Sequence, residues 1–274
     1  NTYSGGTILN AGTLAISNNA ALGTGEVTFA SNSTLSGLAN LTITNNYNIA
    51  TGVNATFTQS ASNAFTNSGI ISGNGTLSQN GAGTLVLSGA NTYSGGTILN
   101  AGTLAISNNA ALGTGTVTFA SNSTLSGLAN LTITNNFTIA SGVNATFTQS
   151  ASTAFTNSGI ISGNGTLSQN GAGTLVLSGA NTYSGRTIIN GGTLALGTGA
   201  SLSTNSTITV NGNLAFTGTD NQTQGVTFST NISGTGTITQ SGAGTITLNP
   251  SLGNTNTVGV FLQTNGTVVL TKDR

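Results

Sequence analysis

The chain has 274 residues, of which three are basic and three acidic, so its formal net charge is zero. It contains no His, Cys, Met or Trp, which excludes an imidazole base, a thiolate nucleophile, the usual zinc sites and the usual haem ligands. Three basic residues cannot neutralise a phosphate backbone, so we expect no nucleic-acid binding.

Small uncharged residues dominate the composition, with 52 Thr, 41 Gly, 37 Asn and 31 Ser. Hydrophobic residues still make up 36% of the chain, and they recur in short alternating runs, which argues against disorder. No apolar run is long enough to predict a membrane-spanning helix or an intact secretory signal peptide.

A long repeat organises the chain. The segment NTYSGGTILNAGTLAISNNAALGTG begins at Asn1 and again at Asn91, and the blocks 1–90 and 91–180 are identical at 85 of 90 positions. A third copy opens at Asn181, diverges, and rejoins the pattern at Ile232 instead of position 251, where the period would place it. A shortening by about 19 residues indicates a smaller unit, because repeat proteins gain and lose whole structural units. We therefore predict three blocks, 1–90, 91–180 and 181–274, built from units of about 18–22 residues.

Each block reads as short strands separated by tight corners. The strands expected along one period are residues 83–89, 103–107, 116–120, 131–134 and 145–149. Apolar and hydroxyl residues alternate in them, which is the period of a strand with one buried face. Gly and Asn residues, which tolerate left-handed backbone angles, lie between the strands. With one Glu and one Lys in the whole chain, we expect no appreciable helix.

Two all-β architectures suit such strands. A sandwich or barrel requires longer antiparallel strands and a varied sequence. A parallel β-helix stacks short rungs, and stacking explains the lack of charge because like charges above one another repel while Asn, Thr and Ser ladders hydrogen-bond. The strand lengths, the shortened third copy and the tandem duplication favour a right-handed parallel β-helix, or β-solenoid, with rungs of about 18–22 residues.

One recurring segment resembles a known family. GAGTLVLSGANTYSGGTILNAGTLAI at Gly81–Ile106, an altered form at Gly171–Leu196 and a truncated form at Asn1–Ile16 resemble the passenger-associated transport repeat of bacterial autotransporter proteins. The resemblance implies a β-helix passenger that is secreted through the outer membrane of a Gram-negative bacterium and displayed or released at the cell surface. It also implies a longer protein with an N-terminal signal peptide and a C-terminal outer-membrane β-barrel. The repeat has no common catalytic residues to transfer.

The carboxylates do not predict a catalytic site. Glu26, Asp220 and Asp273 are the only ones, and they lie far apart in the sequence. A glycosidase requires two carboxylates within about 5–10 Å, and the calcium-binding GGxGxD repeat is absent. We expect no enzyme activity and no catalytic, cofactor-binding or metal-binding residues, and therefore no cofactor.

Other candidate positions have a structural explanation that we favour. Arg186 stands where the other copies have Gly6 and Gly96, and we interpret it as a solvated corner substitution rather than a ligand contact. Tyr3, Tyr93 and Tyr183 share one place in the NTYSG corner, where packing is favoured over a carbohydrate platform. The Thr-x-Thr runs are too irregular for an ice-binding face; they begin at Thr42, Thr56, Thr116 and Thr132. The sequons at Asn32, Asn40, Asn54 and Asn74 are interpreted as strand and corner residues.

The leading functional hypothesis is a non-enzymatic extracellular or cell-surface rod or fibre, because duplication of a solenoid block lengthens it. The alternative is an adhesin that binds host or neighbouring-cell molecules through its lateral face or tip. Strand edges at both ends of such a rod would be unpaired, so we expect each end either to be continued by further sequence or to stack against another copy. Self-association into filaments, end to end or laterally, is therefore a possible interaction. A surface ligand is a further possible partner, and residues 197–274 are where we expect specificity or a cap.

Overall fold

A computed structural model describes the whole chain except residues 206, 230, 249–256 and 272–274. The described residues form strands and turns without any helix, so none of them forms a helix that could cross a bilayer. Two compact units are present, Asn1–Leu131 and Thr132–Arg274. Each is a section of parallel β-solenoid, and the chain makes about 12 turns. The predicted parallel β-solenoid fold is confirmed.

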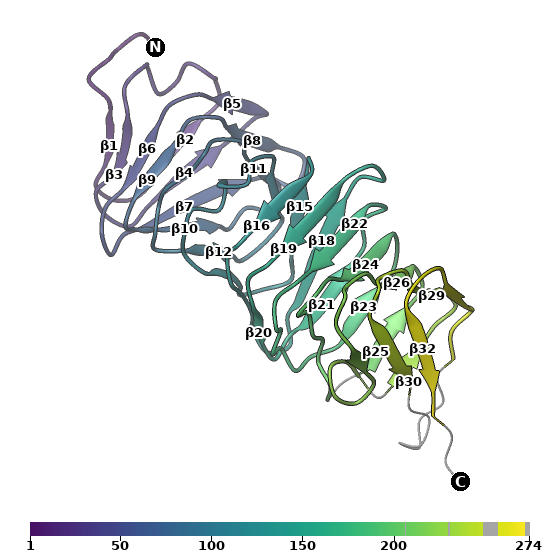
Figure 1. Cartoon of the computed structure of the whole chain (residues 1–274). Helices are drawn as coiled ribbons and strands as arrows, with labels where there is room; N and C mark the ends of the chain where they lie inside the picture. The colour runs from purple at the N-terminus through teal and green to yellow at the C-terminus, as the bar shows by residue number, and fades with distance from the viewer. Residues whose placement is uncertain (206, 230, 249–256, 272–274) are drawn as a thin grey trace. The chain divides into compact units, whose positions relative to one another are not determined.

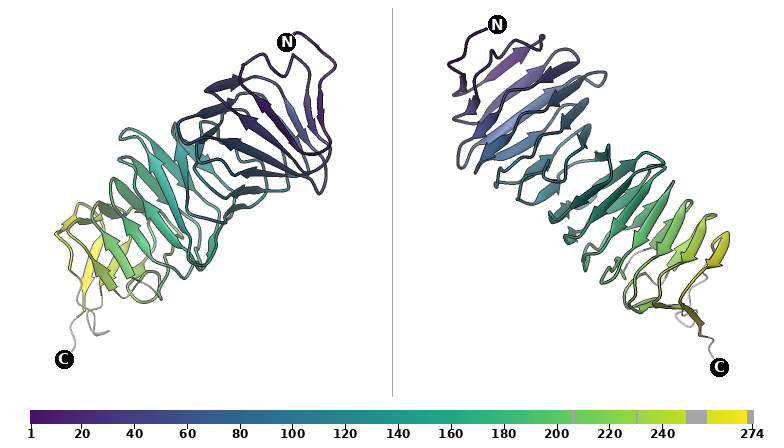
Figure 2. Two further views of the ribbon diagram at one scale, coloured as in Figure 1. Left: turned by 180° about the vertical axis from the view of Figure 1, so that it is seen from behind. Right: turned by 45° about the horizontal axis from the view of Figure 1, so that its top comes forward.

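Unit 1 is wound from short strands that lie side by side in successive turns (Figures 1 and 2). Its strands are β1 (Thr7–Leu9), β2 (Thr13–Ile16), β3 (Val27–Phe29), β4 (Ser33–Gly37), β5 (Leu41–Ile43), β6 (Tyr47–Ile49), β7 (Asn54–Gln59), β8 (Ala64–Asn67), β9 (Ile71–Gly73), β10 (Thr76–Gln79), β11 (Thr84–Leu87), β12 (Thr97–Leu99), β13 (Thr103–Ile106), β14 (Val117–Phe119) and β15 (Ser123–Gly127).

Three parallel sheets form the faces of unit 1. Their strand orders are β1-β3-β6-β9, β2-β4-β7-β10-β12-β14 and β5-β8-β11-β13-β15. The length of a turn varies: Asn80 and Asn100, one turn apart, are separated by 20 residues, whereas the stacked pair Asn48 and Ser72 is separated by 24 residues. The longest turns therefore exceed the predicted range, because corners absorb extra residues without disturbing the strand register.

Unit 2 follows the same pattern. Strand β16 (Leu131–Ile133) crosses the division, and the strands after it are β17 (Phe137–Ile139), β18 (Asn144–Gln149), β19 (Ala154–Asn157), β20 (Ile161–Gly163), β21 (Thr166–Gln169), β22 (Thr174–Leu177), β23 (Thr187–Ile189), β24 (Thr193–Leu196), β25 (Thr207–Val210), β26 (Asn213–Phe216), β27 (Gln222–Thr223), β28 (Asn231–Ser233), β29 (Thr237–Gln240), β30 (Thr245–Leu248), β31 (Val260–Gln263) and β32 (Thr267–Leu270). Its faces are formed by strands in the orders β18-β21-β23-β25-β28 and β19-β22-β24-β26-β29-β31, by the neighbouring strands β17-β20 and by the three-stranded sheet β27-β30-β32.

The sequence repeat is out of phase with the solenoid in unit 1. Thr7 in β1 and Thr97 in β12 hold equivalent places in the repeat, yet β1 and β12 belong to different sheets. Four turns along one face carry the chain from Thr13 to Ile98, whereas one repeat carries it from Thr13 to Thr103. The first block is therefore longer than four turns by the short segment from Ile98 to Thr103, so the second copy begins on the neighbouring face.

The shortened third copy preserves this phase in unit 2. The ISG motif recurs from Ile161 to Ile232, and three turns along one face carry the chain from Leu167 to Ile232. The repeat from Ile161 to Ile232 is therefore longer than three turns by the segment from Ile161 to Leu167. This excess is close to that of the first block, which is longer than four turns by the segment from Ile98 to Thr103. The missing segment therefore amounts to one complete turn, as the shortening predicts.

Inward-pointing apolar side chains fill each unit. In unit 1 an aromatic cluster of Phe29, Tyr47, Phe57 and Phe65 has ring centroids 5.7–6.2 Å apart, and all four residues are fully buried. Burial of one such side chain contributes about 1.5–3 kcal/mol. The core therefore depends on the alternation of apolar residues, as the sequence pattern indicates.

Asn and Gln side chains tie successive turns together. Asn45 Nδ2 donates to the carbonyl oxygens of Gly23 and Gly25 one turn away, at 3.2 and 2.7 Å. Buried Gln79 donates from Nε2 to Gln59 Oε1 at 2.9 Å and to Gly81 O at the same distance. These uncharged amides satisfy corner carbonyls that a buried charge could satisfy only at a high desolvation cost.

Candidate functional site

The two carboxylates that the structure describes, Glu26 and Asp220, lie in different units. Glu26 is exposed and is the single carboxylate of unit 1. Asp220 lies in unit 2 and accepts hydrogen bonds at Oδ2 from Gly199 N (3.1 Å) and Gln222 Nε2 (2.8 Å). Asp273 lies outside the described residues. Among the residues described, no three His, Cys, Asp or Glu side chains cluster to hold a metal ion.

The corner tyrosines are packing residues in the second and third copies. Tyr93 and Tyr183 are buried, and their hydroxyl groups hydrogen-bond the Oγ1 atoms of Thr97 and Thr187 at 2.5 Å. Tyr3 makes the equivalent bond to Thr7 at 2.6 Å but is 41% exposed. The buried ring faces of Tyr93 and Tyr183 offer no platform for a carbohydrate.

The sequon asparagines also have structural partners. The Oδ1 atoms of Asn32 and Asn40 accept from the backbone nitrogens of Asn54 and Ala64 one turn on, at 2.7 and 2.8 Å. Asn54 Oδ1 accepts from Ser78 Oγ at 2.8 Å, and Asn74 Oδ1 accepts from Ser94 Oγ at 3.0 Å. These side chains bridge turns, which agrees with their interpretation as strand and corner residues.

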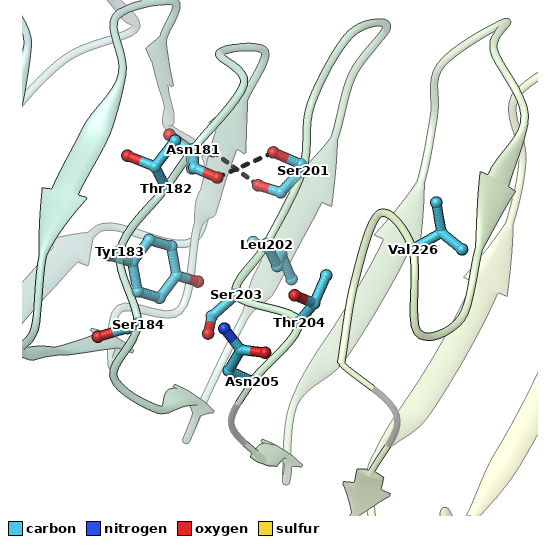
Figure 3. A pocket seen from close by; sticks show the side chains of 10 residues that line it. All are labelled: Asn181, Thr182, Tyr183, Ser184, Ser201, Leu202, Ser203, Thr204, Asn205 and Val226. Atoms are coloured by element: carbon cyan, nitrogen blue, oxygen red, sulfur yellow. Dashed lines mark hydrogen bonds between the residues drawn. The ribbon is translucent and has the colours of Figure 1, made fainter. Parts of the chain in front are cut away.

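A polar pocket of about 160 Å³ opens on unit 2 between two neighbouring turns. One wall is the NTYS corner of the third copy and the other is the segment one turn later, as Figure 3 shows. The lining residues are Asn181, Thr182, Tyr183, Ser184, Ser201, Leu202, Ser203, Thr204, Asn205 and Val226.

The second copy packs more closely at the equivalent corner. Asn91 Nδ2 bonds Ala111 O and Asn181 Nδ2 bonds Ser201 O, so the two copies align at the repeat spacing and Ser203 takes the place of Gly113. Gly113 has a φ of +61°, and a Cβ there would lie 2.2 Å from Tyr93 O. Only glycine allows that approach. Because Ser203 carries a side chain, its segment cannot pack against Tyr183 in the same way.

Backbone hydrogen bonding at this corner also differs between the second and third copies. Thr114 N donates to Tyr93 O at 3.0 Å in the second copy. Within the described part of the chain, Thr204 N and Tyr183 O form no such bond. Leu202 N instead donates to Thr227 O at 2.9 Å, one turn further on. The segment therefore bonds away from Tyr183 at the place where the pocket opens.

Arg186 belongs to the same local change. A Cβ at Gly115 would lie 2.4 Å from Gly96 N, so both glycines allow the second copy to close tightly. The third copy has Asn205 and Arg186 at these two places. Arg186 is exposed and does not line the pocket. Its position agrees with a solvated corner substitution and also reflects the lost close contact.

The walls of the pocket are held by hydrogen bonds, and one lining residue has a buried hydroxyl group without a partner among the described residues. Asn181 Nδ2 donates to Ser201 O at 2.9 Å and Ser201 Oγ donates to Asn181 O at 3.0 Å. Burial raises the pKa of Tyr183, and its bonds to Thr187 and to the backbone of Ser203 offset this only in part, so its phenol stays neutral. Ser203 is 4% exposed, and its Oγ has no partner among the described residues.

Sequence reasoning did not find this pocket. It treated Arg186 as an isolated substitution, and the Ser-Thr-Asn segment at 203–205 carries no chemical motif. The available signal was the simultaneous loss of glycine at three aligned places, Gly96, Gly113 and Gly115. That coincidence becomes meaningful only once the two segments are known to face each other.

Comparison with known proteins gives one result that bears on function. The passenger-associated-transport-repeat family matches the chain at residues 1–16, 77–106 and 167–196. No curated protein and no solved structure shows significant similarity. The matched segments contain the NTYSG corner or the strands that flank it, including β10 to β13 and β21 to β24.

Proposed function

We propose that this chain, which carries three passenger-associated transport repeats, is a non-enzymatic section of an autotransporter-type passenger, secreted by a Gram-negative bacterium or displayed on its surface, where it supplies length. The repeats themselves imply a passenger-type β-helix. The observation that carries the structural role is the deletion of one complete turn in the third copy. Gain or loss of complete turns preserves the stacking of the strands and changes the length of the solenoid.

The surface chemistry supports this role. Outward positions are mostly small neutral residues, as in the Thr84–Thr103–Thr124 ladder across β11, β13 and β15. Equivalent side chains of the first two copies lie on different faces of the solenoid, because the repeat is longer than a whole number of turns. Repetition therefore does not build up one lateral binding face, which favours the rod over an adhesin that binds along its side.

The test is secretion and reach in a bacterial host. The chain is placed between a signal peptide and an autotransporter barrel with an N-terminal epitope tag, beside a variant that lacks residues 91–180. We expect both to become accessible to external protease, with the tag of the shorter variant more strongly shielded from antibody by long surface polysaccharide. Retention of both chains in the periplasm would contradict the passenger assignment. Equal tag exposure would contradict the length role.

The adhesin alternative rests on the polar pocket of the third copy, where Ser203 and Asn205 replace glycines of the nearly identical first two blocks. Binding of the purified chain to host cells, unchanged when residues 91–180 are removed, would favour it. Self-association into filaments stays a prediction; sedimentation at increasing concentration tests it, and a constant monomer mass would contradict it.

A further inference from the structure

We propose that the pocket between residues 181–184 and 201–205 binds a single neutral sugar residue of a saccharide. This goes beyond the rod function and does not depend on it, because the pocket lies within unit 2 and can be tested on the purified chain. Its size, its lack of charge and its free hydroxyl group each limit the ligand.

Size selects a small ligand. The pocket volume of about 160 Å³ corresponds to roughly five water molecules at the density of the liquid. Sites for drug-sized ligands occupy about 300–1,000 Å³. There is room for one six-membered ring with its substituents, and a longer saccharide would have to extend into solvent through the open side.

Charge selects a neutral ligand. None of the ten lining residues is charged. Carboxylate and phosphate ligands are normally held by Arg or Lys through charge-assisted hydrogen bonds, and the nearby Arg186 does not line the pocket. A polyhydroxylated neutral molecule avoids the cost of desolvating an unpaired charge.

The free hydroxyl group selects hydrogen-bonding chemistry. A buried hydroxyl without a partner costs about 1–3 kcal/mol, and Ser203 Oγ has none among the described residues. Because the atom is itself buried, a ligand bonds it once the Ser203 side chain turns toward the pocket. A Ser hydroxyl can both donate and accept, and so can each hydroxyl of a sugar. Thr182, Thr204 and Asn205 add polar groups at the rim (Figure 3).

A small apolar contribution completes the match. Leu202 and Val226 are apolar lining residues on different segments (Figure 3); Leu202 is buried and Val226 is 71% exposed. Sugars carry C–H groups between their hydroxyls, and binding pockets commonly combine apolar walls with a few convergent polar groups. The second copy lacks this arrangement because Gly113 closes its corner, so the chain contains its own negative control.

The experiment follows the backbone amides of the full chain by NMR while methyl α-glucoside or methyl N-acetyl-β-glucosaminide is added. The third copy differs in sequence from the first two, so its amide signals are separable. We expect shifts confined to residues 182–184 and 202–205, with a Kd of about 1–10 mM, typical of one small ligand with few contacts.

Three variants make the test specific. Ser203→Ala should weaken binding at least about fivefold without lowering the unfolding midpoint, because the lost hydroxyl has no partner among the described residues. Thr182→Tyr should block the pocket and abolish binding. Thr92→Tyr, at the equivalent exposed position of the closed corner, should leave binding unchanged.

Several outcomes would overturn the proposal. One is the absence of amide shifts at about 100 mM sugar, well above the expected Kd. Another is equal binding by the Ser203→Ala, Thr182→Tyr and Thr92→Tyr variants. A third is binding of inorganic phosphate at the same amides with higher affinity than either sugar, because the site would then select charge.

Discussion

Single buried hydroxyl groups distinguish copies that are otherwise almost identical. Tyr47 is fully buried, and its hydroxyl has no partner among the described residues. The second copy has Phe137 at the equivalent place, where the ring keeps the same kind of aromatic contact, 5.8 Å from Phe147. The phenol oxygen of Tyr47 therefore adds a desolvation cost without a compensating bond.

Tyr47→Phe should raise the free energy of unfolding by about 1 kcal/mol, because it removes an unsatisfied polar atom and keeps the ring. Urea unfolding followed by circular dichroism measures the change. Tyr93→Phe is the matched control, since its hydroxyl bonds Thr97, and it should lower stability by about 1 kcal/mol. Equal effects of both changes would show that the bond to Thr97 contributes nothing.

At the scale of one element, the geometry of a corner decides whether it can pack closely against the backbone of the neighbouring turn. Gly113 and Gly142 both have positive φ, +61° and +76°. A Cβ at Gly113 would collide with Tyr93 O, whereas a Cβ at Gly142 would meet nothing within 4 Å. The two positions separate the cost of a left-handed backbone from the cost of steric overlap.

Gly142→Ser should destabilise by about 1–2 kcal/mol from backbone strain alone. Gly113→Ser carries the same strain and should cost at least about 2 kcal/mol more from the overlap. Thermal midpoints of the two variants measure the difference. Similar midpoints would contradict the argument that glycine at this place closes the corner, and with it our account of why the third copy is open.

At the scale of the whole molecule, the effect of a deletion depends on whether the residues after it stay on the same faces of the solenoid. Leu77 pairs with Ala55 below it and Thr97 above it, so residues 77–96 make up one complete turn. Removing them places Thr97 where Leu77 stood. The chain itself has lost one turn of similar length in its third copy.

Deletion of residues 77–96 should leave a folded β-solenoid with a cooperative thermal transition and an unchanged circular dichroism signal per residue. Deletion of residues 77–86 removes half a turn and misplaces every following face, so inward side chains no longer meet the core. We expect that variant to lose cooperativity and to become sensitive to protease. Comparable stability of the two variants would contradict the one-turn unit.

Stability of the molecule should fall under alkaline conditions. Burial raises the pKa of Tyr47, Tyr93 and Tyr183 above the ordinary value of a phenol. Unfolded phenols ionise near pH 10 while the folded ones remain neutral, so proton release favours the unfolded chain above that pH. Below it the three contribute their full stability, and the chain has no His to titrate.

The free energy of unfolding should therefore fall above pH 10, by about 1.4 kcal/mol per pH unit for each buried tyrosine. Denaturant titrations at several pH values, with tyrosinate absorbance as a second readout, measure it. Tyr47→Phe should reduce the alkaline slope by about one third. An unchanged slope would show that this phenol is already accessible when folded.

The sequence by itself determined the strands, their parallel stacking, the solenoid and the one-turn shortening. Alternation of apolar and hydroxyl residues is a local property, and it correctly located elements such as β11, β13 and β18. The near absence of charge followed from the same repetition. These features need no knowledge of which residues meet across turns.

Only the tertiary structure decided the phase of the repeat and the position of the pocket. The first repeat block is longer than four turns, and this excess depends on the lengths of the corners. These lengths vary, as the unequal steps from Asn80 to Asn100 and from Asn48 to Ser72 show. The period of a sequence repeat does not reveal them. The pocket depends on whether Ser203 or a glycine faces a tyrosine one turn away. That contact is long-range, and its physical cause, the space needed by a Cβ against another backbone, has no signature in a single segment.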